Sequence, residues 1–186
     1  MTYFIGGDRI YYPVSALLIE FLILSVVESQ DSYGYEISQT VKIVTDIKES
    51  TGQTVINCKD GDTNIQNSNL KDLELKTGLD DLVMQNTSCT NSQIDMSDGD
   101  IKASNIVFRG NNKMTSSLGD ITLGISEENL KDLSIQAETK LGDIKTRKSD
   151  KLGTITRNDD NVVLQSDEQN KNELEIQSSD GDITFR

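Results

Sequence analysis

The sequence predicts a mainly β protein whose larger part is a β-solenoid, or β-roll, of about six short coils. Two observations favour this fold: a glycine-centred corner that returns about every twenty residues, and short segments of alternating apolar and polar residues. A third observation is an apolar N-terminal stretch without such corners, which predicts a small α-helical segment before the repeats. The predicted domains are therefore residues 1–51 and 52–186.

The corner motif reads Asp-Gly-Asp or Leu-Gly-Asp, followed by a β-branched residue. Its copies lie at 60–63, 98–101, 118–121, 141–144 and 180–183, with a weaker one at 152–155. Glycine supplies the positive φ of a tight corner, the flanking aspartate caps the turn, and isoleucine starts the next strand. We therefore expect positive φ at four glycines: Gly99, Gly119, Gly142 and Gly181.

A second repeat supports the same phase. The string Asn69–Leu73 recurs letter for letter as Asn129–Leu133, and both copies run into alternating segments. The apolar members should face one interior: Leu73, Leu75, Ile101, Ile121, Leu133, Ile135, Ile144, Leu174, Ile176 and Ile183. Their polar neighbours should face water: Glu74, Lys76, Lys102, Thr122, Ser134, Gln136, Lys145 and Glu175. Asp-Gly between alternating residues also suits a stack of hairpins, but the recurring spacing favours the solenoid.

Composition agrees with a slender fold. Of the 186 residues, 34% are hydrophobic and 5% aromatic, which suits a narrow core better than a thick globule. Acidic, aromatic-poor chains can also be disordered, but the regular alternation argues against disorder for residues 54–186. A formal net charge of −13 opposes binding to nucleic acid or to an anionic membrane.

The N-terminal stretch is the most apolar part of the chain. The run Val14–Val27 is too short to span a bilayer and contains Glu20, so we expect no transmembrane segment. It lacks the basic start and cleavage site of a signal peptide, which predicts a cytoplasmic protein, with export by this segment as the alternative. Helices are predicted over Val14–Val27 and Gly34–Val44. An exposed helical face would favour self-association of the chain; its members are Leu17, Leu18, Phe21, Leu22 and Leu24.

Residues 12–51 carry three strings, at 15–24, 31–39 and 46–51, of which the second contains Tyr-Gly-Tyr-Glu-Ile-Ser and the third Lys-Glu-Ser-Thr. This segment resembles the opening of PadR-type transcriptional regulators. The resemblance implies a winged helix cut at the first turn of its recognition helix, because Thr51 runs directly into a strand-like segment and no wing follows. The residues that would remain to contact DNA are Lys48, Ser50 and Thr51.

Residues 54–186, with their Gly-Asp-Ile corners after Leu-x-Ile strands, resemble the bacterial putative-adhesin β-strand repeat family. That resemblance implies a right-handed β-roll and a non-enzymatic structural or interaction module with an unknown protein or surface partner. The alternative function is that of a PadR-family regulator that binds DNA.

Catalytic and metal-binding patterns are missing from the sequence. It contains no histidine, no nucleophile elbow and no phosphate-binding loop, so we expect neither an enzyme nor a cofactor. Recurring aspartates could bind calcium in principle, but without the known loop spacings we interpret them as turn caps; they are Asp62, Asp100, Asp120, Asp143 and Asp182. Cys58 and Cys89 are expected to fill the core, although a disulfide between them stays open.

Overall fold

The computed structural model describes residues 2–5, 8–11, 21–29, 38–46, 53–146, 152–167 and 169–186. Within these residues the chain forms two β-sheets. The first sheet has ten strands in the spatial order β1 (Thr2–Ile5), β2 (Asp8–Tyr11), β5 (Thr54–Asp60), β8 (Leu73–Leu79), β10 (Gln93–Asp98), β12 (Asn111–Leu118), β18 (Asn172–Asp180), β14 (Leu133–Leu141), β17 (Val162–Gln165) and β16 (Thr154–Arg157).

The second sheet has nine strands. Eight of them follow the order β15 (Ile144–Thr146), β19 (Ile183–Phe185), β13 (Ile121–Ile125), β11 (Ile101–Arg109), β9 (Leu82–Thr90), β6 (Thr63–Gln66), β4 (Ser38–Asp46) and β3 (Phe21–Ser29). The short strand β7 (Asn69–Lys71) pairs with β9 beside this path.

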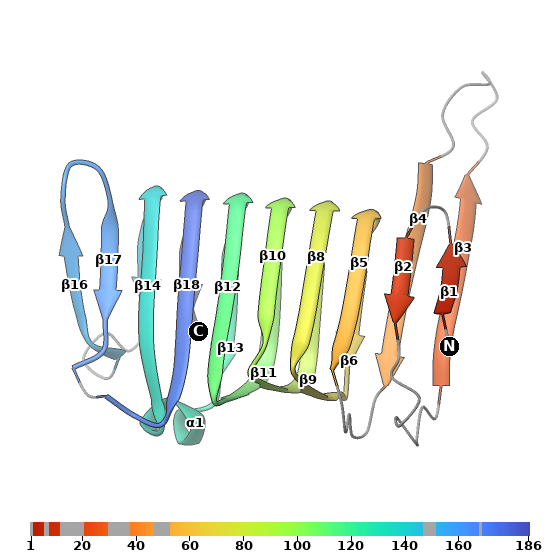
Figure 1. Cartoon of the computed structure of the whole chain (residues 1–186). Helices are drawn as coiled ribbons and strands as arrows, with labels where there is room; N and C mark the ends of the chain where they lie inside the picture. The colour runs from red at the N-terminus through yellow and green to blue at the C-terminus, as the bar shows by residue number, and fades with distance from the viewer. Residues whose placement is uncertain are drawn as a thin grey trace.

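The two sheets are built from stacked coils, as Figure 1 shows. In each coil a strand of the first sheet turns through a corner into a strand of the second sheet. The six pairs are β5–β6, β8–β9, β10–β11, β12–β13, β18–β19 and β14–β15, and neighbouring coils pair in parallel. Parallel stacking in register distinguishes a solenoid from a stack of hairpins, so the predicted β-solenoid is confirmed. Its right-handedness stays a prediction.

The core lies between the two sheets. Every second residue of a strand points into it, and equivalent residues of neighbouring coils form rows along the stack. All ten apolar residues predicted to face inward are at most 2% exposed. Of their eight polar neighbours, Lys76, Lys102, Gln136 and Lys145 are exposed, and the other four are half-buried. The half-burial follows from stacking, because the side chains of the coils on either side cover part of each outward position.

The order of the coils departs from the order of the chain. Strand β18 pairs in parallel with β12 on one side and β14 on the other, so the last coil in sequence lies between two earlier ones. After β13 the chain forms the helix α1 (Glu127–Lys131) before it starts β14. Beyond β14, strands β17 and β16 extend the first sheet in antiparallel pairing.

The helices predicted near the N-terminus are wrong wherever the structure describes that region. Residues 21–29 and 38–46 form β3 and β4, which pair antiparallel from Phe21 opposite Asp46 to Ser29 opposite Ser38. Both segments are rich in β-branched residues, and strand β6 offers β4 a further parallel partner. Residues 14–20 and 34–37, the remainder of the two predicted helices, lie outside the described residues.

Both sheets continue past the predicted domain boundary. Strand β2 pairs with β5, and β4 pairs with β6, so strands from before residue 51 join strands from after it. The division of the chain at residues 51 and 52 stays a prediction. Among the described residues, no helix has both the length and the apolar character needed to cross a membrane.

Candidate functional site: the aspartate corner

The corner between the two sheets requires glycine for two reasons. Gly99, Gly119 and Gly181 have φ of 113°, 113° and 143°, which confirms three of the four predicted positive values. A Cβ on Gly119 would also lie 2.2 Å from the carbonyl oxygen of Gly99 in the adjacent coil. The expectation for Gly142 is wrong, because its φ is not positive. Its Cβ would nevertheless lie 2.1 Å from the Gly181 carbonyl oxygen, so close approach alone requires glycine there.

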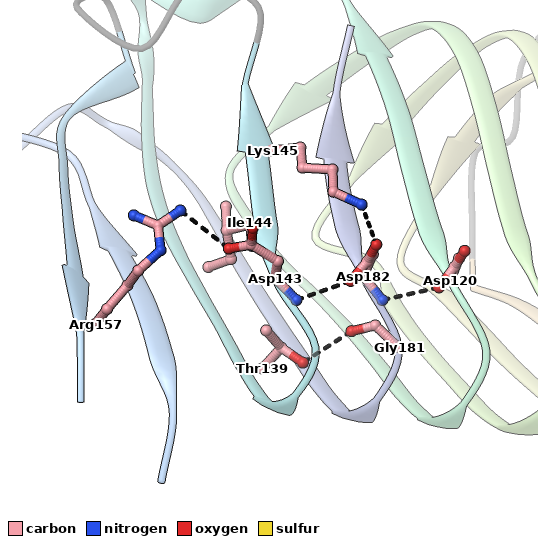
Figure 2. Close-up of polar contacts among 8 residues, drawn as sticks. All are labelled: Asp120, Thr139, Asp143, Ile144, Lys145, Arg157, Gly181 and Asp182. Atoms are coloured by element: carbon pink, nitrogen blue, oxygen red, sulfur yellow. Dashed lines mark hydrogen bonds and ion pairs between the residues drawn. The ribbon is translucent and has the colours of Figure 1, made fainter. Parts of the chain in front are cut away.

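Immediately after these corners lies an aspartate row. Each carboxylate Oδ1 accepts a hydrogen bond from the backbone N–H of the aspartate in the next coil. In spatial order the donors are Asp81 (3.3 Å, to Asp62), Asp100 (2.9 Å, to Asp81), Asp120 (2.9 Å, to Asp100), Asp182 (2.8 Å, to Asp120) and Asp143 (2.8 Å, to Asp182). The last three carboxyl groups appear in Figure 2. Each carboxylate thus binds the turn of the neighbouring coil, and the row follows spatial order rather than sequence order.

Three cations neutralise part of the row. The Lys102 ammonium lies 3.0 Å from both Asp81 and Asp100, the Arg157 guanidinium lies 3.0 Å from Asp143, and Lys145 pairs with Asp182. The N–H of Asp120, followed by Lys102, lowers the pKa of the Asp100 carboxyl. Lys145, followed by the N–H of Asp143, lowers the pKa of Asp182. Both carboxylates are therefore ionised at neutral pH.

Before the corners runs a second row, which we call the leucine–aspartate ridge. In spatial order it consists of Asp60, Leu79, Asp98, Leu118, Asp180 and Leu141. The strand register places Asp60 opposite Leu79, Asp98 opposite Leu118, and Asp180 between Leu118 and Leu141. The three leucines are 51%, 48% and 70% exposed, and among the described residues they are the large hydrophobic side chains most open to solvent.

Sequence reasoning missed this ridge. The residue before each corner glycine is visible in the sequence, but in chain order Leu118 is followed by Leu141 and then Asp180. The strict alternation arises only because β18 lies between β12 and β14. A coil at Asp80-Asp81 was also missed, because Asp80 occupies the glycine position with a φ of 89°.

The bend of the second sheet carries an asparagine row. Asn67, Asn86 and Asn105 have φ of 49°, 52° and 53°, a conformation that asparagine tolerates better than most residues. The Nδ2 of Asn105 donates to Oδ1 of Asn86 (2.9 Å), and Nδ2 of Asn86 donates to Oδ1 of Asn67 (3.2 Å). An open hollow of about 440 Å³ lies along this row. Because the amides bind one another, we interpret the row as a structural element of the bend.

The other sequence-predicted site residues fall in two groups. Lys48, Ser50 and Thr51, the proposed DNA contacts, lie in the segment 47–52 outside the described residues. Cys58 and Cys89 form no disulfide with each other and are 2% and 0% exposed, which confirms the core interpretation. Burial raises the pKa of Cys89 to about 12, so this thiol is unreactive at neutral pH. Over the described ranges no cluster of three or more histidine, cysteine or acidic side chains is arranged to hold a metal.

Comparisons with known proteins gave one family match and one similar solved structure. The model of the Toastrack DUF4097 family matches residues 25–186. Among solved structures, a crystal structure of a putative cell adhesion protein from Clostridium sporogenes ATCC 15579 is similar, with 15% identity and a TM-score of 0.30. The alignment covers 68% of this chain and 56% of that one, so it spans little more than half of the solved protein. No curated protein matches the sequence.

The family match bears on the N-terminal resemblance. It includes residues 25–51, most of the segment that resembles a PadR-type regulator, and no comparison supports that resemblance. The β-repeat part of the prediction is supported, since the match extends over the coils, the aspartate row and the ridge. The chain belongs to the Toastrack DUF4097 family.

Proposed function

We propose that this chain is a non-enzymatic structural or interaction module and that the leucine–aspartate ridge is its contact surface. The observation that carries the proposal is the regular exposure of three leucines on alternate coils. Exposed apolar side chains gathered in one row are typical of interaction sites, whereas isolated ones are common on any surface. The corners beneath the ridge are fixed by the aspartate row, so the row of leucines is presented on a rigid support.

The charge of the corner defines the chemistry of a suitable partner. The ridge and the aspartate row together carry nine carboxylates, and among the described residues only Lys102, Lys145 and Arg157 pair with them. A partner that covers the ridge must therefore supply positive charge as well as apolar groups. Leucines two coils apart are separated by about 9.6 Å, twice the strand spacing. Residues i and i+7 of an α-helix are about 10.5 Å apart, so a basic amphipathic helix fits this repeat.

The test uses a synthetic helix of 21 residues, with leucine at every seventh position and lysines beside each leucine, titrated calorimetrically into the full chain at about 0.15 M salt. Wild type should bind, and the double variant Leu118→Ser/Leu141→Ser should bind at least about tenfold more weakly. The matched control is Glu128→Gln/Asp132→Asn, which removes two exposed carboxylates at helix α1, at the opposite end of the first-sheet strands from the ridge (Figure 1). Equal binding by wild type and the leucine variant would show that charge attraction alone holds the helix. The proposal that the ridge is the contact surface would then be wrong.

The alternative function, DNA binding as a PadR-family regulator, has a separate test. A mobility-shift assay of the full chain on its upstream DNA would support DNA binding if it gave a tight, sequence-dependent shift that Lys48→Ala abolished. We expect no such shift, because the net charge of −13 opposes contact with phosphates. Cytoplasmic location and self-association through the apolar N-terminal segment stay predictions.

A further inference from the structure

The coil β18–β19 fills a slot between two coils that precede it in sequence. On one side β18 pairs with β12 from Asn111 opposite Glu173 to Leu118 opposite Asp180. On the other side it pairs with β14 from Leu133 opposite Asn172 to Leu141 opposite Asp180. In Figure 1 this strand stands between β12 and β14, although it comes after every other strand of the first sheet in sequence.

Core packing, the aspartate row and one side-chain hydrogen bond hold this coil in the slot. Its apolar side chains enter the common core and are 4% exposed or less: Leu174, Ile176, Ile183 and Phe185. Asp182 takes its place in the aspartate row between Asp120 and Asp143. Thr139 Oγ1 donates to the Gly181 carbonyl oxygen at 2.8 Å, as Figure 2 shows. None of these contacts depends on which chain supplies the coil, so the same coil of another copy makes all of them.

The connection between β17 and β18, of which residues 166, 167 and 169–171 are described, carries the chain from β17 into the slot. Strand β17 pairs with β14 on the side away from β18, so the connection must cross the end of β14 to reach the slot. At its start Ser166 exchanges hydrogen bonds with Ile135, donating from its N–H to the carbonyl (2.9 Å) and accepting at Oγ from the N–H (2.7 Å). Near its end Asn170 donates from its N–H to Ser134 Oγ (2.5 Å) and from Nδ2 to the Lys131 carbonyl (3.3 Å). The coil can therefore leave the slot by a swing of this connection, without unthreading β14 to β17.

An empty slot is a strong acceptor. Without β18, the facing edges of β12 and β14 would both present rows of unpaired N–H and C=O groups. The buried row between them would also meet water. A strand with the same alternation and corner restores both edges at once. The ligand that fits the slot best is therefore a coil with the sequence of β18–β19.

We propose that the slot between β12 and β14 is a strand-accepting site, and that its second ligand is the β18–β19 coil of another copy of this chain. Copies then join by exchange of this coil, which is a low-cost route to assembly because native contacts are re-formed between chains. The net charge of −13 opposes the approach of two copies, so added salt should promote the exchange. This inference does not depend on the ridge or on its partner.

The experiment places one cysteine on each side of the β12–β18 pair in separate full-length chains. Thr115 and Gln177 are opposite in register and lie on the outward face, next to the buried Met114 and Ile176. A Thr115→Cys chain and a Gln177→Cys chain are mixed at high concentration, incubated in about 0.5 M salt, and then oxidised. The native thiols Cys58 and Cys89 are buried and do not compete. A disulfide-linked pair of chains should form, in an amount that rises with concentration and with salt.

Two controls make the result decisive. The pair Thr115→Cys with Asp159→Cys reports random collisions, because Asp159 lies in the exposed β16–β17 turn, and it should give at least about tenfold less product. A single chain carrying both Thr115→Cys and Gln177→Cys shows that the geometry permits the bond; Glu138→Cys replaces Thr115→Cys if it does not, since Glu138 faces Gln177 from β14. Cross-linking no greater than the random control overturns the proposal. So does light scattering that finds only monomers when wild type incubated at about 1 mM is diluted.

Discussion

The same five residues, Asn-Leu-Lys-Asp-Leu, occur twice in this chain and fold in two ways. At 69–73 they begin as strand β7, where Leu70 lies opposite Cys89 of β9 and is fully buried. At 129–133 they begin inside helix α1, and Leu130 is only half-buried against the core. Both copies then enter a first-sheet strand with a buried leucine, Leu73 or Leu133.

Context outside the five residues explains the difference. The first copy follows β6 and the bend at Asn67, and β9 offers it an edge to pair with. The second copy follows Ser126, whose Oγ accepts the Asn129 N–H, and two glutamates in the first helical turn, all of which favour a helix start. There the Asn129 side chain replaces strand pairing, because it accepts from the Phe108 N–H (2.9 Å) and donates to the Phe108 carbonyl (3.1 Å).

The two copies also differ in how far the chain must advance. After the first copy it moves to the adjacent coil, from β5 to β8. After the second copy it moves from β12 past β18 to β14, a step of two coils. Identical sequence therefore does not imply identical structure even within one repeat protein. The position of neighbouring edges decides which structure forms.

The two leucines should show the largest difference. Leu70→Ala removes a fully buried side chain and should lower the free energy of unfolding by about 2–5 kcal/mol. Leu130→Ala should cost less than about 1.5 kcal/mol, because that side chain is only partly buried. Urea unfolding of both variants measures the difference. Equal losses would mean that the two copies are equivalent and that α1 packs as tightly as β7.

For the two asparagines of the repeat, the second copy should contribute more to stability than the first. Asn129→Ala leaves the backbone N–H and C=O of Phe108 without partners and should cost about 1–3 kcal/mol. Asn69 is exposed, so Asn69→Ala should change stability by no more than about 0.5 kcal/mol. Hydrogen exchange at the Phe108 amide should accelerate only in the Asn129 variant. Unchanged protection there would show that the side chain does not substitute for a strand.

The helix start provides a smaller test of why the second copy is helical. Ser126→Ala removes the cap on Asn129 N–H and should cost about 1 kcal/mol in urea unfolding. Ser117→Ala is the control, since Ser117 is exposed in β12 near the ridge and should be close to neutral. Ser126→Asp should restore most of the loss, because aspartate is an equally good cap. A loss that Asp does not restore would assign the role of Ser126 to packing.

The smallest expected effect concerns acid. The folded-state pKa values of Asp100 and Asp182 are lowered, so their ionised forms stabilise the fold above the unfolded pKa of about 3.9. This stability is lost as pH falls through the folded pKa values, since protonation removes the charge that the Asp120 N–H and Lys102 bind on Asp100 and that Lys145 binds on Asp182. Asp100→Asn and Asp182→Asn should each flatten the fall in stability below about pH 4. An acid profile identical to that of wild type in both variants would contradict this prediction.

Much of the fold could be predicted from the sequence, because alternation and corner spacing are local signals. The ten buried positions of the core are correct for that reason. The corner at Asp80 was not predicted because it lacks glycine. Oδ2 of Asp80 accepts the Gly61 N–H at 2.6 Å, a contact between coils that the sequence does not reveal. The insertion of β18 between β12 and β14 was not predicted. All coils share one register, so several spatial orders of the coils satisfy the same apolar–polar alternation.

The N-terminal error has a different origin. Ile37, Val41 and Val44 have helical spacing, but short apolar runs fit strands as well, and β-branched residues with a neighbouring edge favour the strand. The ridge could not be found in advance for a third reason. Its alternation exists only in space, so it depends on the coil order that the sequence leaves open.

The aspartate row has a polarity, since every carboxylate accepts from the coil on the same side. At its end the pattern changes, because Asp143 Oδ1 accepts the N–H of Ile144, the next residue in its own chain, and also binds Arg157 of β16. The acceptor that a seventh coil would need is therefore occupied, and the β16–β17 hairpin covers the adjacent strand. A stack of identical units is in principle an open-ended polymer. Here the Asp143–Arg157 pair and the β16–β17 hairpin together occupy the end at which a further coil would be added.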